Sequence, residues 1–310
     1  MNVLAWHVHG SWMTAFVQGS HRYYVPVVPD RGPDGRGRAQ TWDWPQSVVE
    51  IKPHSLREEK FDAIVLQRPH EYELARQMFG ITPGVDVPAI YVEHNAPQGL
   101  INQMRHPLAD VPGLSFVHVT HFNDLFWDCG ESPTCVIEHG VVDPGYRYTG
   151  EVAKAAVVIN EPERRARVTG TDLVERISSS IPLELFGMGA AARGGFENLR
   201  QSELHEQLPK RRVYFHPIRW TSLGLSLIEA MHLGMPVVAL ATTEIPEAVP
   251  DDAGITSTNV RSLADGLRDL LQNPAKAKTL GLRARAHARE RYGLERFLRD
   301  WDNVFEDTVC

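Results

Sequence analysis

Cysteine is scarce in this sequence, and its spacing forms no recognisable pattern. Cys129, Cys135 and Cys310 include no Cys-x-x-Cys pair. So few thiols exclude a disulfide framework and a structural zinc site as working hypotheses. His7 and His9 lie two apart on an expected strand, yet no Asp, Glu or Cys nearby completes a metal-ligand set. We therefore expect no metal site.

Long hydrophobic runs and an excess of basic charge are also missing. The 310 residues carry 32 Lys and Arg against 39 Asp and Glu, a formal charge of −7, so no general basic field attracts nucleic acid. Apolar runs such as residues 235–241 are too short to cross a membrane, and no basic segment typical of a signal peptide precedes residues 3–8. We expect a cytoplasmic protein without a transmembrane segment or a nucleic-acid partner. Whether it forms a homo-oligomer stays open.

Short apolar runs alternate with helical stretches through the first half of the chain. Strands separated by helices form mostly parallel sheets through right-handed crossovers. Residues 30–38 are dense in glycine and charge and predict a mobile surface loop. The expected strands are residues 3–8, 23–28, 62–66, 89–92, 115–119 and 134–137, and the expected helices are residues 12–17 and 71–79.

The periodicity breaks over residues 138–146, where we place a linker, and the second half then repeats the scheme. A terminal helix over residues 294–305 has a strongly aromatic face that must be buried. The pattern predicts two doubly wound domains, residues 1–145 and 146–293, with a C-terminal helix (294–310) that crosses back onto the first domain. The expected strands of the second domain are residues 155–159, 183–186, 213–215 and 237–240, and its expected helices are residues 260–271 and 274–292.

The segment most informative about chemistry spans residues 216–240, a strand exit, a glycine-bearing loop, a helix from about Leu225, and a buried strand. Free backbone amides at the helix start and the positive end of its dipole favour an anion such as a diphosphate. Gly224 lets a phosphate approach the backbone, and Ser226 adds a hydroxyl donor. Glu229, in the second turn, could accept two hydrogen bonds from neighbouring ribose hydroxyls. The alternative is an ordinary helix start with a solvated glutamate.

This segment resembles the signature of the family 4 retaining glycosyltransferases. In that family a Glu precedes a Gly-Phe-Gly-Leu-like loop, and a second Glu follows eight positions later, ahead of Ala-Met, a glycine and Pro-Val-Val. The resemblance implies an α/β fold of the GT-B type, with two Rossmann-like domains, an interdomain cleft, an acceptor-binding first domain and a donor-binding second domain. The matching residues are Gly224, Leu225, Glu229, Ala230, Met231, Gly234, Pro236, Val237 and Val238.

One departure from the family pattern concerns the first glutamate. Thr221 stands in its place, and Ser222 and Leu223 replace the usual Gly-Phe. In the family that glutamate contacts the transferred sugar. Thr221 can still form a hydrogen bond, but it carries no charge to stabilise a developing oxocarbenium ion. We therefore expect residues 221–223 to bind the donor. The loss of the glutamate is expected to alter which donor is chosen or the rate of sugar transfer.

Two arginines are candidates for binding the diphosphate. Relatives in the family carry Gly-Arg, then Lys-Gly five residues after the arginine. Here Arg164 takes the arginine place, Thr169 replaces the lysine, and Arg167 is near enough to substitute. A guanidinium fork suits phosphate oxygens. The alternative is a solvated basic turn.

The remaining candidates follow expected strands. Gly187 and Gly189 resemble the family's Gly-x-Gly beside the nucleotide, and Gly10 matches a glycine turn near the diphosphate. His94 ends a strand, at the edge where open α/β sheets bind ligands, and resembles the family's histidine that contacts the donor sugar. The alternative for His94 is a histidine held by local turn hydrogen bonds. None of these glycines forms the Gly-x-Gly-x-x-Gly fingerprint of nicotinamide-binding proteins.

The resemblance implies a hexosyltransferase-like enzyme that moves a sugar from a nucleoside diphosphate sugar to an acceptor hydroxyl, with retention and without a metal. The donor is a substrate, and no cofactor is expected. The acceptor is a sugar, a lipid-linked sugar or a small molecule. Thr221 and the missing lysine leave a non-catalytic or weakly active nucleotide-sugar-binding protein open as an alternative. A GT-B sugar-nucleotide epimerase or a phosphorylase also remains open.

Overall fold

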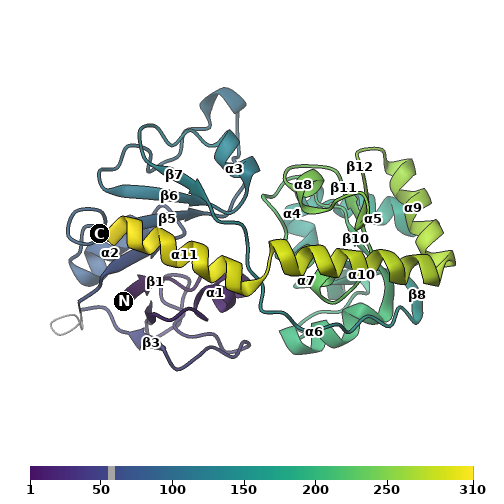
Figure 1. Cartoon of the computed structure of the whole chain (residues 1–310), viewed down its shortest axis with the longest axis horizontal. Coiled ribbons are helices and arrows are strands. Elements are labelled where there is room, and N and C mark those ends of the chain that lie inside the picture. Colours follow the sequence, from purple (N-terminus) through teal and green to yellow (C-terminus); the bar gives the residue numbers. More distant parts are fainter. Residues whose placement is uncertain (55–59, 310) are drawn as a thin grey trace. The chain divides into compact units, whose positions relative to one another are not determined.

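The computed structural model describes residues 1–54 and 60–309, which form two compact units (Figure 1). Unit 1 comprises Met1–Val142 together with the chain from Leu294 onward, and unit 2 comprises Asp143–Gly293. The sequence placed these boundaries after residues 145 and 293. Cys310 lies outside the described residues. Within the described ranges, every helix is too short or too polar to cross a membrane.

Unit 1 contains a sheet whose strands, within residues 1–54 and 60–309, run in the order β3-β2-β1-β4-β5-β6-β7. All neighbouring strands are parallel. The strands are β1 (Asn2–Ala5), β2 (Arg22–Pro26), β3 (Val48–Ile51), β4 (Ala63–Leu66), β5 (Ala89–Glu93), β6 (Leu114–His118) and β7 (Thr134–Val136). The helices are α1 (Gly10–Phe16), α2 (Glu71–Phe79), the 3-10 turn η1 (Ile101–Gln103), α3 (His121–Phe126) and α11 (Leu294–Val309).

The strand order of unit 1 creates a switch point between β1 and β4. The chain adds β2 and β3 on one side of β1 and then returns to add β4 on the other side. Ligands of open α/β sheets bind where such a reversal leaves a crevice at the carboxyl ends of the strands. Residues 6–10, after β1, and residues 67–71, after β4, lie at this position.

The last helix, α11, belongs to unit 1 and contacts α1 (Figure 1). It packs through the aromatic face that its sequence shows. Trp301 and Phe305 are fully buried. The ring centroid of Trp301 lies 4.9 Å from that of Phe16 and 5.8 Å from that of Trp12, both on α1. Large aromatic side chains dominate the energy of a core, so α11 is an integral part of unit 1.

Unit 2 repeats the architecture with a parallel sheet whose strands, among the residues described, run in the order β12-β11-β10-β8-β9. Its switch point lies between β8 and β10. The strands are β8 (Val152–Val158), β9 (Leu183–Phe186), β10 (Arg211–His216), β11 (Val237–Leu240) and β12 (Gly254–Ser257). The helical segments are α4 (Pro162–Thr169), α5 (Thr171–Ser178), η2 (Ala190–Arg193), α6 (Gln201–Gln207), η3 (Leu208–Lys210), α7 (Leu225–His232), α8 (Ile245–Ala248), α9 (Val260–Gln272) and α10 (Pro274–Arg291).

The two strands that the sequence did not predict, β3 and β12, lie at sheet edges. Each contains four residues, and neither is buried along its whole length. An edge strand has a neighbouring strand on one side only, and less of its surface is buried in the core. Its apolar pattern is therefore short and resembles that of a loop. Gly254 at the start of β12 weakens the pattern further.

The α11 contact leads to a stability prediction. Trp301→Ala leaves a cavity against Trp12 and Phe16, and truncation of a buried tryptophan costs roughly 3–5 kcal/mol. We expect a matching loss in the free energy of unfolding of unit 1, measured by urea denaturation. Asn303→Ala, at an exposed position of the same helix, is the control and should change it by less than about 0.5 kcal/mol. Wild-type stability of Trp301→Ala would contradict the packing.

Candidate functional site

The switch point of unit 2 brings together two segments that are far apart in sequence. Helix α4 follows β8, and residues 217–224 follow β10, its neighbour in the sheet. The main-chain amide of Arg219 donates to the carbonyl of Val168 at 2.9 Å. Gly170, which ends α4, lies so close to Pro217 that a Cβ would clash with the Pro217 carbonyl. The candidate arginines and the glycine-bearing loop therefore share one edge of the sheet.

Helix α7 begins at this edge without a cap. Gly224 is its N-cap residue in an extended conformation (φ −76°, ψ 119°), and no side chain forms a cap hydrogen bond there. The first turn contains no acidic residue. The amides of Leu225 and Ser226 thus begin a helix whose positive dipole end is not neutralised by a carboxylate of that turn. Such a helix start suits an anion.

Beneath Gly224 lies a buried polar cluster that the sequence reading missed. A Cβ at Gly224 would lie 2.8 Å from Cε1 of His216, whose residue is 1% exposed. The Tyr214 hydroxyl donates to Ser226 Oγ at 3.0 Å and lies 3.5 Å from His216 Nδ1. His216 Nε2 is buried and has no hydrogen-bond partner in the described part of the chain. The available signal was the position of His216 at the end of a predicted strand.

The imidazole of His216 is neutral at ordinary pH. Burial lowers its pKa from 6.5 to about 3, because the charged form loses its hydration. The ring therefore contributes a hydrogen-bonding group but no positive charge. Gly224 is required here by the packing of its backbone on this ring, in addition to any approach of a phosphate.

Glu229 is buried in the second turn of α7. It is 5% exposed, and its Oε2 lies 3.4 Å from His205 Nε2 on α6. Burial excludes the alternative of a solvated glutamate. Its predicted contact with a ribose stays a prediction. His205 was missed by the sequence reading, because it lies on a separate helix.

Arg164 and Arg167 lie on α4, which is kinked at Ala166, and both side chains are exposed. Arg164 Nε donates to Glu161 Oε1 at 2.9 Å, and Arg167 lies 3.1 Å from Asp172. The segment is thus a helix rather than a turn, and both of its arginines are solvated while paired with a carboxylate. Exposed ion pairs contribute little net stability, so both guanidinium groups can exchange their carboxylate for a phosphate at small cost.

Arg219 is a third cation at this edge and was not among the sequence candidates. It holds Asp172 with two hydrogen bonds of 2.6 and 2.8 Å, and it also donates to the carbonyl of Arg167. The hydrogen bond from Arg219 lowers the pKa of Asp172. Arg219 follows β10, so its position after a predicted strand was the signal that could have found it.

The loop after β9 contains Gly187 and Gly189, both with positive φ (126° and 78°). A Cβ at Gly187 would clash with the Ile159 carbonyl at the end of β8. Asn160 Oδ1 accepts from the Met188 amide at 2.9 Å and fixes the two loops to each other. Protein packing is thus sufficient to require glycine at position 187, and the contact with a nucleotide stays a prediction.

Residues 221–223 differ in exposure. Ser222 and Leu223 are buried, at 2% and 5%, whereas Thr221 is partly exposed. A donor that reaches this loop would therefore meet the Thr221 side chain, and backbone atoms at the two following positions.

Gly10 and His94 belong to unit 1, at the carboxyl ends of β1 and β5. Gly10 begins α1, and a Cβ there would clash with Trp42. The ring of His94 lies 4.2 Å from His9 and 6.5 Å from His139, measured between centroids. Burial lowers the pKa of His94 well below 6.5 and that of His9 to about 4. His94 therefore lies beside His9, and burial keeps both of these rings neutral.

The candidates thus form one group in each unit. Eleven of the thirteen lie in unit 2, within the loops and helices that follow β8, β9 and β10, and two lie in unit 1 after its strands; these are Arg164, Arg167, Gly187, Gly189, Thr221, Ser222, Leu223, Gly224, Leu225, Ser226 and Glu229 in unit 2, and Gly10 and His94 in unit 1.

Within residues 1–54 and 60–309, no cluster of three or more His, Cys, Asp or Glu side chains has the arrangement of a metal site.

The family model that matches this chain falls within unit 2. Residues 196–287 match the family model described as Glycosyl transferases group 1. The poly(ribitol-phosphate) alpha-N-acetylglucosaminyltransferase of Staphylococcus aureus (strain COL) is 35% identical over 86 residues. That alignment covers 26% of this chain and 17% of the relative, so the match spans about a sixth of the relative's length.

Likeness in structure extends over both units. Sucrose-phosphate synthase from Thermosynechococcus elongatus matches with a TM-score of 0.73 at 13% identity, covering 99% of this chain and 98% of that chain. HepE from Anabaena, solved with UDP-glucose, matches with a TM-score of 0.71 at 12% identity, covering 99% and 100%. The chain therefore shares the α/β GT-B fold of these proteins, with a Rossmann-like sheet in each unit.

The burial of His216 leads to a prediction about pH. The unfolded chain takes up a proton at this residue below pH 6.5, whereas the folded chain does so only near pH 3, so stability is lost as the pH falls below 6.5. One histidine of this kind costs about 1.4 kcal/mol between pH 7.5 and 5.5. The loss in unfolding free energy over this interval, measured by urea denaturation, should be smaller by about that amount in His216→Phe.

The same substitution at His121, whose side chain is exposed at the start of α3, is the control and should leave the pH dependence of wild type. His9 and His94 are retained in both variants, so their contributions cancel in the comparison. Equal pH dependence of His216→Phe and wild type would show that His216 is not held neutral by burial.

Proposed function

We propose that this protein is a retaining glycosyltransferase, which moves a sugar from a nucleoside diphosphate sugar to an acceptor hydroxyl. The observation that carries the proposal is the uncapped start of α7 at the switch point of unit 2, with Glu229 buried one turn further along. The first feature suits a diphosphate, and the second supplies a carboxylate that suits the hydroxyls of a ribose. The match of residues 196–287 to a glycosyltransferase family model supports the same assignment.

In this proposal the donor lies on unit 2. The amides of Leu225 and Ser226 bind the diphosphate, and Arg164 and Arg167 offset the charge that develops on it as it leaves. Arg219 adds a further guanidinium beside Asp172. HepE was solved with UDP and with UDP-glucose, so uridine nucleotides are the first donors to test.

The chemistry needs no cofactor in this proposal. The bond between the anomeric carbon and the diphosphate oxygen breaks, and the acceptor oxygen forms its bond on the same face of the sugar. The acceptor proton passes to the leaving diphosphate, so charge and atoms balance. His94 orients the sugar, and the arginines supply the positive charge that a metal would otherwise provide. We further propose that the protein acts in the cytoplasm.

Nucleotide binding tests the donor site directly. Calorimetric titration with UDP, GDP and ADP should show saturable binding of at least one nucleotide to wild type. Glu229→Ala removes the acceptor of two ribose hydroxyl hydrogen bonds, and hydrogen bonds to a charged group contribute about 1.5–3 kcal/mol. We therefore expect its affinity to fall roughly ten- to hundredfold.

Glu206→Ala, an exposed position on α6, is the matched control and should bind as wild type does. Circular dichroism of Glu229→Ala checks that the loss of the buried contact with His205 leaves the fold intact. No binding by any nucleoside diphosphate, or unchanged affinity of a folded Glu229→Ala, would remove the basis of the donor site.

Thr221 favours a second candidate, a protein that binds a nucleotide sugar with little or no transfer. The enzyme proposal predicts that incubation with a nucleotide sugar and acceptors gives a product whose anomeric configuration, read by proton NMR, matches the donor, also in the presence of EDTA. Thr221→Glu should then raise the rate, because it restores a charge beside the sugar. Binding without turnover in wild type, and turnover in Thr221→Glu alone, would favour the second candidate. A change of configuration within the donor itself, without an acceptor, would indicate an epimerase.

A further inference from the structure

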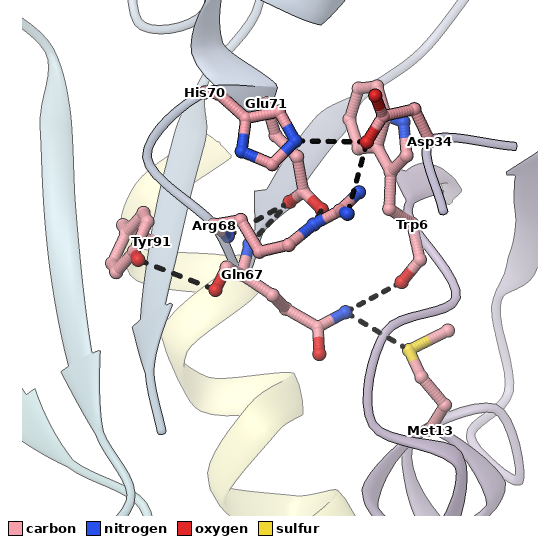
Figure 2. Close-up of polar contacts among 8 residues, drawn as sticks. All are labelled: Trp6, Met13, Asp34, Gln67, Arg68, His70, Glu71 and Tyr91. Carbon is pink, nitrogen blue, oxygen red and sulfur yellow. Dashed lines mark hydrogen bonds and ion pairs between the residues drawn. The ribbon is translucent and has the colours of Figure 1, made fainter. Parts of the chain in front are cut away.

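Arg68 occupies the switch point of unit 1, directly after β4 and beside the end of β1 (Figure 2). Its guanidinium is paired with Glu71 at the start of α2 and with Asp34 from the loop of residues 30–38, and His70 in turn contacts Asp34. This is the edge at which an open parallel sheet binds its ligand. None of these residues takes part in the proposed donor site.

Glu71 fixes the orientation of Arg68. Its side chain is fully buried, and Oε1 accepts from Arg68 Nε at 2.7 Å. Oε2 accepts from the main-chain amides of Gln67 and Arg68 at 2.6 and 3.2 Å. The carboxylate therefore holds the inner edge of the guanidinium through Nε and leaves the two terminal amino groups for other partners.

Asp34 binds only one of the two terminal amino groups of Arg68. Its Oδ1 lies 3.0 Å from one terminal amino group of Arg68 and 2.9 Å from His70 Nε2, so one oxygen serves both donors. The second amino group, NH2, is buried and has no hydrogen-bond partner within the described residues. Trp6, the first residue after β1, also has its indole Nε1 buried without a partner there. Buried donors without a partner are costly, which points to a group missing from this site.

The electrostatic surroundings favour an anion with several oxygens. Arg68 and Arg36 both lower the pKa of His9 at the same edge, after burial, which is the larger cause. Asp34 and His70 are the exposed members of the cluster, with 44% and 52% of their side chains accessible, and Asp34 belongs to a loop rather than to a helix or strand. An exposed ion pair is weak, so a stronger anion can displace it.

We propose that Arg68 binds a phosphate group of the acceptor, and that the Asp34 carboxylate occupies this place when no acceptor is bound. The proposal rests on the proposed function and names the chemical class of its acceptor. A phosphate offers more acceptor oxygens than one carboxylate oxygen, and it can bind both terminal amino groups of Arg68 in the bidentate geometry that guanidinium groups favour, with His70 as a further donor. Displaced Asp34 moves out with its loop.

Phosphate binding can be tested without transfer activity. Inorganic phosphate and glycerol 3-phosphate are titrated into the full chain at constant ionic strength, and the indole N–H signal of Trp6 is followed by NMR. Both should shift this signal in a saturable manner, whereas glycerol and chloride should not. Asp34→Ala removes the competing carboxylate, and we expect at least tenfold tighter binding. Arg68→Lys keeps the charge but loses the planar fork, and we expect at least tenfold weaker binding.

Glu73 and Arg76 on α2 form an exposed ion pair of the same type and provide the matched controls. Glu73→Ala and Arg76→Lys should bind phosphate as wild type does. Phosphate binding that is unchanged in a folded Asp34→Ala, or equal in Arg68→Lys and wild type, overturns the proposal. Calorimetry with UDP on the same samples tests the donor site of unit 2 separately from the phosphate site at Arg68. If wild type does not bind the nucleotide, the donor site is contradicted, whereas the phosphate titration still decides the role of Arg68.

Discussion

The parallel pairing of the strands in each sheet determines where the polar groups of this protein meet. Because every strand pair in both sheets is parallel, the carboxyl ends of neighbouring strands lie at one edge, and the loops that follow them are adjacent. This places the start of α7 beside α4 in unit 2, and Arg68 beside the residues that follow β1 in unit 1. Residues with no proximity in sequence thereby become neighbours.

Glycine has a consistent role at these edges. Gly224 lies on the buried ring of His216, and Gly187 lies against the carbonyl of Ile159. In both cases a side chain would collide with protein before any ligand is considered. The backbone of each loop therefore stays close to the sheet, with its amide groups near the strand ends. Glycine is needed both for packing against the sheet and for the close approach of a ligand. A short glycine motif alone therefore predicts a tight loop more reliably than it predicts a bound ligand.

The sequence predicted those features that depend on local patterns. Strands β9 and β11 and helix α2 have the predicted bounds, since β9 is apolar apart from Glu184, β11 is a continuous apolar run, and α2 is an amphipathic helix ended by glycine. The start of α7 was predicted for the same reason. The pairing of Glu229 with His205 and that of Arg68 with Asp34 could not be predicted, because each depends on which loops the fold brings together. The kinked helix that carries Arg164 and Arg167 was likewise hidden by its polar composition.

The position of α11 affects the order in which the two units form during synthesis. Unit 2 is one continuous stretch, Asp143–Gly293, and all of its core residues have been made before the last helix emerges. Unit 1 begins first but finishes last, because Trp12 and Phe16 on α1 pack against Trp301 and Phe305 of α11. Until α11 has been synthesised, the nascent chain exposes the aromatic side chains of α1. Chaperone binding to this surface would be favoured during that time.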